Sequence, residues 1–448
     1  MKKVLLVYPP FCTPASPPYS ITYIHSFLKN NCDHNIAVLD VNLEFHKLKF
    51  ADYQKSYKDS SKWEDYEGKT KEYHQLTIKT YAENNKKIRN NEKPEFFDEM
   101  LKLIKDKNPD VVAFSLVYSS QVFYAYSLIK ELKGVKVVIG GPAVNKKLIE
   151  VADESLANEI ELLNFIEERE IDHDSLNFET SPDFSVYNLD SYFTPKPVIP
   201  LRTSTTCPYQ GCSFCAHFTS VPYFEFPLEL IKKTVVNSKQ KYFFIIDDMI
   251  PTKRLLRIAE MLKPLNVNWT CQLRPTKDLD FDTLKTLRDS GLTMLIWGVE
   301  SGNDRVLKLI NKGTNKKDIA QVLNDSHKAG IRNTVYILFG FPTETEEELL
   351  ETIDFLKENE EAIDLISVSE FGLQKGTKVY NDAEKYGIKN IVEEERDLLE
   401  PKISFETVSG LTREEVKKLK GGQKKTIENI NKFPKTMNFF REHMFCSI

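Results

Sequence analysis

Apolar positions along the chain alternate between short β-branched runs and longer segments with helical spacing. In the amino-terminal part this pattern predicts strands at Lys3–Val7, Asn35–Leu39, Val111–Ser115 and Lys136–Ile139, and helices at Tyr19–Lys29, Phe96–Lys107 and Gln121–Leu132. This order predicts a Rossmann-like, doubly wound parallel sheet covered by helices. A polar stretch at about residues 44–94, rich in Lys, Glu, Asn and Tyr, interrupts the order, and we expect an insertion with short helices there.

The same alternation resumes after an acidic, proline-containing connection at about residues 167–197. Strands are expected at Val198–Thr203, Tyr242–Ile246, Asn268–Leu273, Met294–Val299, Thr334–Phe339 and Leu365–Phe371, with helices between them. Successive strand–helix units of this kind predict a partial (β/α)6 barrel of the TIM type, whose chemistry lies at the carboxyl ends of the strands. The predicted domains are therefore residues 1–195, residues 196–375 and a charged helical appendage at 376–448.

Composition and charge narrow the class of protein. The 448 residues include 61 Lys and Arg against 66 Asp and Glu, a net charge of −5, which argues against a general nucleic-acid binder. No apolar run approaches the roughly 20 residues of a membrane-spanning helix. The apolar run near Met1 is cut short by Pro9 and Pro10, so we interpret it as a strand and not as a signal peptide. The 7 cysteines, an odd number, then favour a reducing cytoplasm over a disulfide framework.

Three of the cysteines lie close together, directly after the first predicted strand of the barrel. Cys207, Cys212 and Cys215 have the spacing C-x4-C-x2-C. Thiolates are soft ligands that suit an iron–sulfur cluster or zinc. Zinc would need a fourth ligand such as His217, which follows Cys215 more closely than is usual in zinc sites, so the spacing favours iron–sulfur. A four-iron cluster on three thiolates keeps one iron open to a small molecule.

On these residues the chain resembles the radical SAM superfamily, whose usual spacing is C-x3-C-x2-C with an aromatic residue before the last cysteine. Phe214 matches the aromatic position, and this chain has one extra residue between Cys207 and Cys212. Four further segments resemble members that carry an amino-terminal cobalamin-type domain, namely Trp297–Thr314, Leu338–Glu346, Leu6–Pro10 and Val137–Pro142.

The resemblance implies a [4Fe–4S] cluster on the three cysteines, with S-adenosylmethionine (SAM) bound to its open iron. It also implies reductive cleavage of SAM to a 5′-deoxyadenosyl radical, which abstracts hydrogen from an unactivated carbon of a peptide or natural product. The implied partners are that peptide or small-molecule substrate and a one-electron reductant such as ferredoxin or flavodoxin. No nucleic-acid partner is expected.

Further candidate cofactor-binding residues stand at the ends of predicted strands. Glu300 is expected to accept hydrogen bonds from the amine or ribose of SAM, and Arg274 to hold its carboxylate. The alternatives are a capping or surface acid for Glu300 and an interdomain ion pair for Arg274. Asp247 and Asp248 would bind the methionine ammonium, orient substrate or hold magnesium, and one of them is expected to cap the next helix.

Glycine, aromatic and cysteine residues complete the candidates. Gly340 allows close backbone approach to adenine, or else forms a plain strand-to-helix turn. Tyr209, Phe214 and Phe218 flank the cysteines and would shield the cluster, pack around adenine or belong to the core. Cys271 is expected to be a small buried residue, and its alternative role is hydrogen donation to a radical.

The sequence leaves cobalamin binding open. Cobalamin domains often carry D-x-H-x-x-G, but none of the 8 histidines lies in such a frame, and Val117–Gln121 holds no histidine. With cobalamin, the resemblance implies C-methylation; with a relic domain used for packing or docking, it implies oxidation, epimerisation or rearrangement. A methylthiotransferase is disfavoured because a second cysteine triad is missing. Outside this class, the alternatives are a zinc-stabilised binding protein and a family member without activity.

Overall fold

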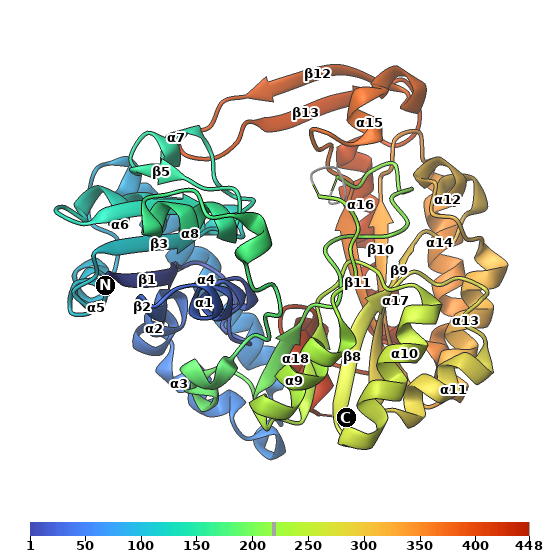
Figure 1. Ribbon diagram of the computed structural model, residues 1–448. Helices are drawn as coiled ribbons and strands as arrows, with labels where there is room; N and C mark the ends of the chain where they lie inside the picture. The colour runs from blue at the N-terminus through green and yellow to red at the C-terminus, as the bar shows by residue number, and fades with distance from the viewer. Residues whose placement is uncertain (217–220, 448) are drawn as a thin grey trace. The chain divides into compact units, whose positions relative to one another are not determined.

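The computed structural model describes residues 1–216 and 221–447, and the chain divides into two compact units (Figure 1). Unit 1 consists of Met1–Pro200, Lys233–Gln240 and Glu395–Glu400. Unit 2 consists of Leu201–Lys232, Lys241–Glu394 and Pro401–Ile448. Each unit contains its own parallel sheet.

A five-stranded sheet forms the centre of unit 1, in the order β2-β1-β3-β4-β5, with all neighbouring strands parallel. The strands are β1 Lys3–Tyr8, β2 Asn35–Asp40, β3 Val111–Ser115, β4 Lys136–Gly140 and β5 Glu154–Ser155. The helices around them are α1 Tyr19–Asn31, α5 Phe97–Lys105, α6 Val122–Glu131, α7 Lys146–Ile149 and α8 Glu159–Glu167. Leu6, Phe27 and Leu163 pack between β1, α1 and α8 in the core. The predicted Rossmann-like sheet is confirmed.

The polar insertion of unit 1 is helical, but it does not consist of short helices alone. α2 Val41–Lys49 and α3 Ala51–Tyr57 precede α4 Tyr66–Arg89, which has 24 residues. The Asp65 side chain accepts a hydrogen bond from Gly68 N at the start of α4, and three basic residues lie in the last turn. These charges suit the helix dipole. Because most residues of α4 are polar, the helix shows little apolar periodicity, and the sequence therefore did not predict its length.

The second sheet has six strands in the order β11-β10-β9-β8-β7-β6, and its strands β7 to β11, which pair in parallel, form the centre of unit 2. The strands are β6 Val198–Leu201, β7 Tyr242–Ile245, β8 Asn268–Leu273, β9 Leu292–Glu300, β10 Arg332–Phe339 and β11 Leu365–Glu370. The helices after successive strands are α9 Leu228–Ser238, α10 Thr252–Leu262, α11 Phe281–Asp289, α12 Asp304–Ile310 with α13 Lys316–Lys328, and α14 Glu346–Glu358. Because β6 and β11 stand at opposite ends of the strand order, the barrel is open, and the predicted partial barrel is confirmed.

The sequence predicted a helical appendage after residue 375. The structure shows helices there together with two strands. β12 Ile388–Glu394 and β13 Lys402–Thr407 form an antiparallel pair between α15 Lys378–Asn381 and the helices α16 Arg413–Gly422, α17 Lys424–Ile430 and α18 Arg441–Cys446. Five of the seven residues of β12 are exposed, so the strand lacks the apolar alternation that identifies a half-buried strand.

A search of the described residues finds no helix long and apolar enough to cross a membrane.

Candidate active site

The cysteine loop of unit 2 is fixed at its middle by Ser213. This residue is fully buried; its amide donates to Ile310 O at 2.8 Å, and its carbonyl accepts from Val379 N at 3.0 Å. Phe214 packs against the apolar cluster that contains Ile310 and Val379. The loop is therefore held between the end of α12 and α15, and Phe214 serves as a packing residue in these contacts.

The three cysteines are partly buried. Cys215 N donates to Cys212 O at 3.3 Å, which closes a turn between them. Across residues 1–216 and 221–447, no three His, Cys, Asp or Glu side chains converge closely enough to hold a single metal ion. His217 and Phe218 lie outside the described residues. The ligand set of Cys207, Cys212 and Cys215 thus stays a prediction from spacing.

A stacked arginine stands beside this loop. The Arg274 guanidinium carbon lies 3.5 Å from the centroid of the Tyr209 ring, and Nη1 donates to Lys312 O at 3.0 Å. The Tyr209 hydroxyl donates to Asn311 O at 2.7 Å. Arg274 Nε is buried and has no hydrogen-bond partner in the part of the chain that the structure describes. Arg274 is therefore held by stacking and by a carbonyl group, with one inward donor left over.

Glu300 and Lys312 form a nearly buried ion pair. Lys312 Nζ lies 2.8 Å from Glu300 Oε1, and the two side chains are 8% and 14% exposed. Burial lowers the pKa of Lys312, but Glu300 and Cys212 outweigh it, and the net shift is upward. Burial raises the pKa of the Cys212 thiol, and the positive charge of Lys312 opposes that shift. Lys312 thus connects Glu300 electrostatically to the cysteine loop.

The backbone at Glu300 is bent to make this arrangement. Glu300 has φ +68°, and the register of β9 against β10 shifts so that Gly298 faces Tyr336 while Glu300 faces Ile337. A positive φ is costly for a residue with a side chain, and such strain gathers at functional sites. A Cβ on Gly298 would lie 2.8 Å from Lys312 Nζ and 3.0 Å from Glu300 Oε1. Gly298 is therefore the residue that leaves room for the ion pair.

Sequence reasoning missed Lys312. It follows the short helix α12, so no strand end points to it. The available signal was its place in Trp297–Thr314, one of the segments that carry the family resemblance.

The two aspartates after β7 have different surroundings. Asp247 is buried and accepts hydrogen bonds from Thr203 N, Thr203 Oγ1 and Ser204 Oγ at 2.6–2.8 Å, and burial raises its pKa. These bonds join the end of β7 to the start of the cysteine loop, so Asp247 has a structural role. Asp248 is exposed. The next helix, α10, has Pro251 at its N-cap, so the expectation that one of the two acids caps it is wrong.

Gly340 occupies a tight turn after β10. It has φ +76°, its amide donates to Glu344 Oε2 at 2.5 Å, and a Cβ would lie 2.9 Å from Val416 of α16. Burial raises the pKa of Glu344 to about 7. The contacts of Gly340 thus go to the turn and to α16, and a role at adenine stays a prediction.

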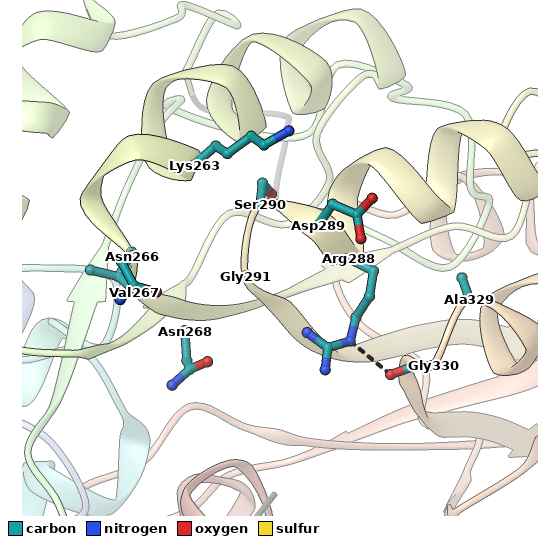
Figure 2. A pocket seen from close by; sticks show the side chains of 10 residues that line it. All are labelled: Lys263, Asn266, Val267, Asn268, Arg288, Asp289, Ser290, Gly291, Ala329 and Gly330. Atoms are coloured by element: carbon teal, nitrogen blue, oxygen red, sulfur yellow. Dashed lines mark hydrogen bonds between the residues drawn. The ribbon is translucent and has the colours of Figure 1, made fainter.

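Unit 2 also has a hollow of about 540 Å³ at the amino ends of its strands, opposite the end that carries Arg274 and Glu300. Figure 2 shows Lys263, Asn268, Arg288 and Ser290 around it, with Arg288 Nε donating to Gly330 O at 3.0 Å. Asn268 starts β8, whereas Arg274 follows the end of that strand. Because barrel chemistry belongs to the carboxyl ends, this hollow is not the candidate active site.

The carboxyl edge of the unit 1 sheet is different in character. Asp40, at the end of β2, accepts hydrogen bonds from Leu43 N at 2.8 Å and the Tyr192 hydroxyl at 2.9 Å, and burial raises its pKa to about 7. In the loop after β3, Gln121 Oε1 accepts from Val117 N and Tyr118 N, and its Nε2 donates to Pro9 O. The Tyr118 side chain is 53% exposed at this edge.

The part of unit 2 that contains the cysteine loop matches a known family. Residues 201–356 match the model described as the Radical SAM superfamily. The chain contains a radical SAM domain. This domain implies a [4Fe–4S] cluster and SAM as cofactors, which confirms these two predicted cofactors.

Two curated relatives of this radical SAM chain come from Chlorobaculum tepidum. Bacteriochlorophyllide d C-12(1)-methyltransferase is 30% identical over 193 residues, which are 40% of this chain and 42% of the relative. Bacteriochlorophyllide d C-8(2)-methyltransferase is 25% identical over 215 residues, 44% of this chain and 47% of the relative. The chain thus spans less than half the length of these relatives.

Solved structures resemble the chain over almost its full length. The cobalamin-dependent SAM radical enzyme OxsB with aqua-cobalamin bound has a TM-score of 0.64 at 14% identity, covering 91% of this chain and 65% of OxsB. The radical SAM methyltransferase TsrM from Kitasatospora setae, with cobalamin and a [4Fe–4S] cluster bound, has a TM-score of 0.58 at 13% identity, covering 96% of this chain and 89% of TsrM. At such identities the similarity shows a shared fold.

Proposed function

We propose that this chain is a cobalamin-dependent radical SAM methyltransferase that acts on an unactivated carbon of a small-molecule or peptide substrate. The observation that carries the proposal is the combination of a radical SAM domain with a Rossmann-like unit, in a fold shared with OxsB and TsrM. The methyltransferase names of the two Chlorobaculum tepidum relatives support it. A cytoplasmic location and a ferredoxin or flavodoxin as reductant belong to the same proposal.

The residues of unit 2 fit a cluster and SAM. When bound, the cluster supplies the electron that cleaves SAM, and cobalamin supplies a carrier for the methyl group. Cys207, Cys212 and Cys215 would be the thiolate ligands, and the charge of Lys312 near Cys212 favours its thiolate form. The unpartnered Arg274 Nε would donate to a carboxylate, as SAM carries.

Glu300 would orient the other end of the methionyl group. Its Oε1 is occupied by Lys312, and Oε2 has no hydrogen-bond partner among the described residues, so Oε2 would accept from an ammonium group. Because the ion pair fixes the Glu300 side chain, the acceptor is in place before the ligand arrives. Such preorganisation lowers the entropic cost of positioning.

The edge of the unit 1 sheet fits a large, flat cofactor held by main chain. Gly141 has φ +109°, and a Cβ there would lie 2.4 Å from Leu116 O, so the loops after β4 and β3 meet backbone to backbone. Gly140 is similarly close to Leu156 O. With no histidine in Val117–Gln121, this loop supplies no imidazole to cobalt. We propose that cobalamin is held here by shape and by Tyr118, without a histidine ligand from this loop.

The test is anaerobic purification with iron–sulfur reconstitution, followed by iron, sulfide, zinc and cobalt analysis. We expect about four irons per chain, retention of added hydroxocobalamin, and release of 5′-deoxyadenosine from SAM under reduction. With SAM labelled in its methyl group, label should appear in the cobalamin fraction. Stoichiometric zinc without iron would instead support the zinc-stabilised binding protein. SAM cleavage without cobalamin retention would support the non-methylating alternatives.

A further inference from the structure

The end of the chain packs on the inner face of the unit 2 sheet. Asn333 of β10 donates to Leu323 O of α13 and accepts from Trp297 Nε1 of β9, so odd-numbered positions of β10 face the helix layer. Thr334 and Tyr336 therefore face the opposite, inner side. Met444 Sδ lies 3.6 Å from Thr334 Oγ1, so α18 lies on that inner side, against the sheet (Figure 1).

Further contacts hold the terminal segment in place. The Phe445 ring meets the Tyr242 ring of β7 edge-on, with centroids 5.3 Å apart. Asn438 Nδ2 donates to Ile366 O of β11 at 2.8 Å. His443, Met444 and Phe445 are at most 1% exposed. The segment thus reaches strands from both sides of the open barrel and forms part of its interior.

Arg441 is the charged side chain that this segment brings to the inner face. Its Nη1 donates to the Tyr336 hydroxyl, and its guanidinium carbon lies 5.7 Å from the Tyr336 ring and 5.9 Å from the Phe244 ring. Among the described residues, no ion pair within 4 Å joins Arg441 to a carboxylate, Glu442 included. A guanidinium has five N–H donors, and among residues 1–216 and 221–447 Arg441 uses one of them, toward the neutral Tyr336 hydroxyl.

The position of Arg441 relates it to the candidate active site. Tyr336 faces Gly298 across the strands, and Gly298 lies directly beneath the Glu300–Lys312 pair. Burial raises the pKa of Tyr336; Arg441 opposes this shift, and Glu442 and Glu300 add to it. Arg441 therefore lies one layer below the residues assigned to SAM, on the same face of the sheet.

We propose that Arg441 binds a carboxylate group of the substrate inside the barrel, an inference that rests on the proposed function. An arginine fork matches a carboxylate in a planar, two-bond geometry. The charges of Glu442 and Glu300 both raise the pKa of Tyr336, and this negative potential would repel a doubly charged phosphate more strongly than a singly charged carboxylate. The Phe244 and Tyr336 rings would cover an apolar group attached to that carboxylate.

The test uses reconstituted holoenzyme and two probes of nearly the same shape, the anionic 4-fluorobenzoate and the neutral 4-fluorobenzamide, each titrated by ¹⁹F NMR. We expect the benzoate to bind about tenfold more tightly than the benzamide. Arg441→Gln should abolish this preference, and Arg441→Lys should reduce it. Arg413→Gln, at an exposed arginine of α16, is the matched control and should leave the preference unchanged.

The outcomes separate this inference from the proposed function. Equal affinity of the wild type for both probes, or an unchanged preference in Arg441→Gln, would overturn the carboxylate site even if the protein holds iron and cleaves SAM. SAM affinity, measured by equilibrium dialysis, should be unaffected by Arg441→Gln; a tenfold loss would place Arg441 in the SAM site and overturn its assignment to substrate. Failure to hold iron or cleave SAM would instead count against the proposed function. If Arg441→Gln does not fold, the test uses the wild type and Arg441→Lys. No benzoate preference in the wild type, or an undiminished preference in Arg441→Lys, would then overturn the proposal.

Discussion

The two parallel sheets of this chain differ in the charged residues at their carboxyl edges. At the edge of unit 1, burial raises the pKa of Asp40 to about 7 and that of Cys12 to about 12, which favours their uncharged forms. At the edge of unit 2, Lys312 and Glu300 form a nearly buried ion pair, and Arg274 keeps an unused donor among the described residues. The edge of unit 2 thus combines acids whose pKa burial raises, Asp247 and Glu344, with a buried ion pair.

This difference teaches that similar architectures support different kinds of recognition. Under the proposed function, the edge of unit 1, where the loops after β3 and β4 pack backbone to backbone at Gly141, would hold cobalamin. The edge of unit 2, with a prepositioned carboxylate and guanidinium, suits a small zwitterion such as the methionyl part of SAM. Under the proposed function, the two edges divide the work between methyl carrier and radical source.

The largest expected effect comes from removing one predicted cluster ligand. Cys212→Ala should lower iron from about four to less than one per chain and abolish SAM cleavage, because three thiolates are needed for the cluster. Iron analysis and the visible spectrum measure this. Cys271→Ala is the matched control, since Cys271 is fully buried in β8, and it should keep its iron. The reverse pattern would show that the ligands are misassigned.

The charged residues of the site differ in how well the sequence predicts their positions. Arg274 and Glu300 follow apolar strands, so their place at the carboxyl edge could be predicted. Lys312 could not be placed from the strand pattern, because it comes from a loop whose position depends on how α12 packs; its one signal was the family resemblance of Trp297–Thr314. The same limit explains Asp247. It ends a strand as Glu300 does, but only the fold shows that Thr203 and Ser204 satisfy its oxygens.

The fold itself was predictable where strands are buried and hard to predict where charge dominates. The buried strands β1, β3 and β9 read as apolar runs. The long helix α4 and the strand β12 are mostly polar, since each packs only a few residues against the rest of its unit. Their stability depends on contacts distant in sequence, which local periodicity does not record.

The next effect concerns the ion pair at the edge of unit 2. Lys312→Met should lower the free energy of unfolding by about 3 kcal/mol, because it leaves the Glu300 carboxylate buried without its partner. Urea unfolding measures this. The double variant Lys312→Met/Glu300→Gln should recover most of the stability without recovering SAM affinity. If stability is not recovered, the loss is due to packing and not to the unpaired charge.

Asp40 at the carboxyl edge of unit 1 should make the stability of the fold depend on pH. The folded-state pKa of Asp40, about 7, lies above the unfolded value of 3.8, so the folded chain binds this proton more tightly. The stabilisation is on the order of 4 kcal/mol; it is complete below about pH 4 and is lost as the pH rises through about 7. Asp40→Asn should flatten this dependence between pH 5 and pH 8. Asn also accepts the N-cap bond from Leu43 N, so the helix start is preserved.

The control for Asp40 is Asp190→Asn, at an exposed aspartate of the same unit, which should leave the pH dependence as in the wild type. Thermal unfolding at several pH values measures both variants. An unchanged slope in Asp40→Asn would mean that Asp40 is charged in the folded chain, and the contrast between the two edges would then fail.

The smallest effect tests how closely the edge of unit 2 is packed. Gly298→Ala places a methyl group 2.8 Å from Lys312 Nζ, so the ion pair must shift, and we expect a loss of about 1–2 kcal/mol in unfolding free energy. Gly372→Ala is the matched control, because a Cβ there meets nothing within 4 Å. The two variants differ in what surrounds the methyl group, so any excess loss in Gly298→Ala measures the rigidity of the Glu300–Lys312 pair. SAM affinity should fall together with stability, since a displaced Glu300 no longer presents Oε2 in the position that the pair fixes. A loss of stability with unchanged SAM affinity would mean that the pair supports the fold and does not orient the ligand.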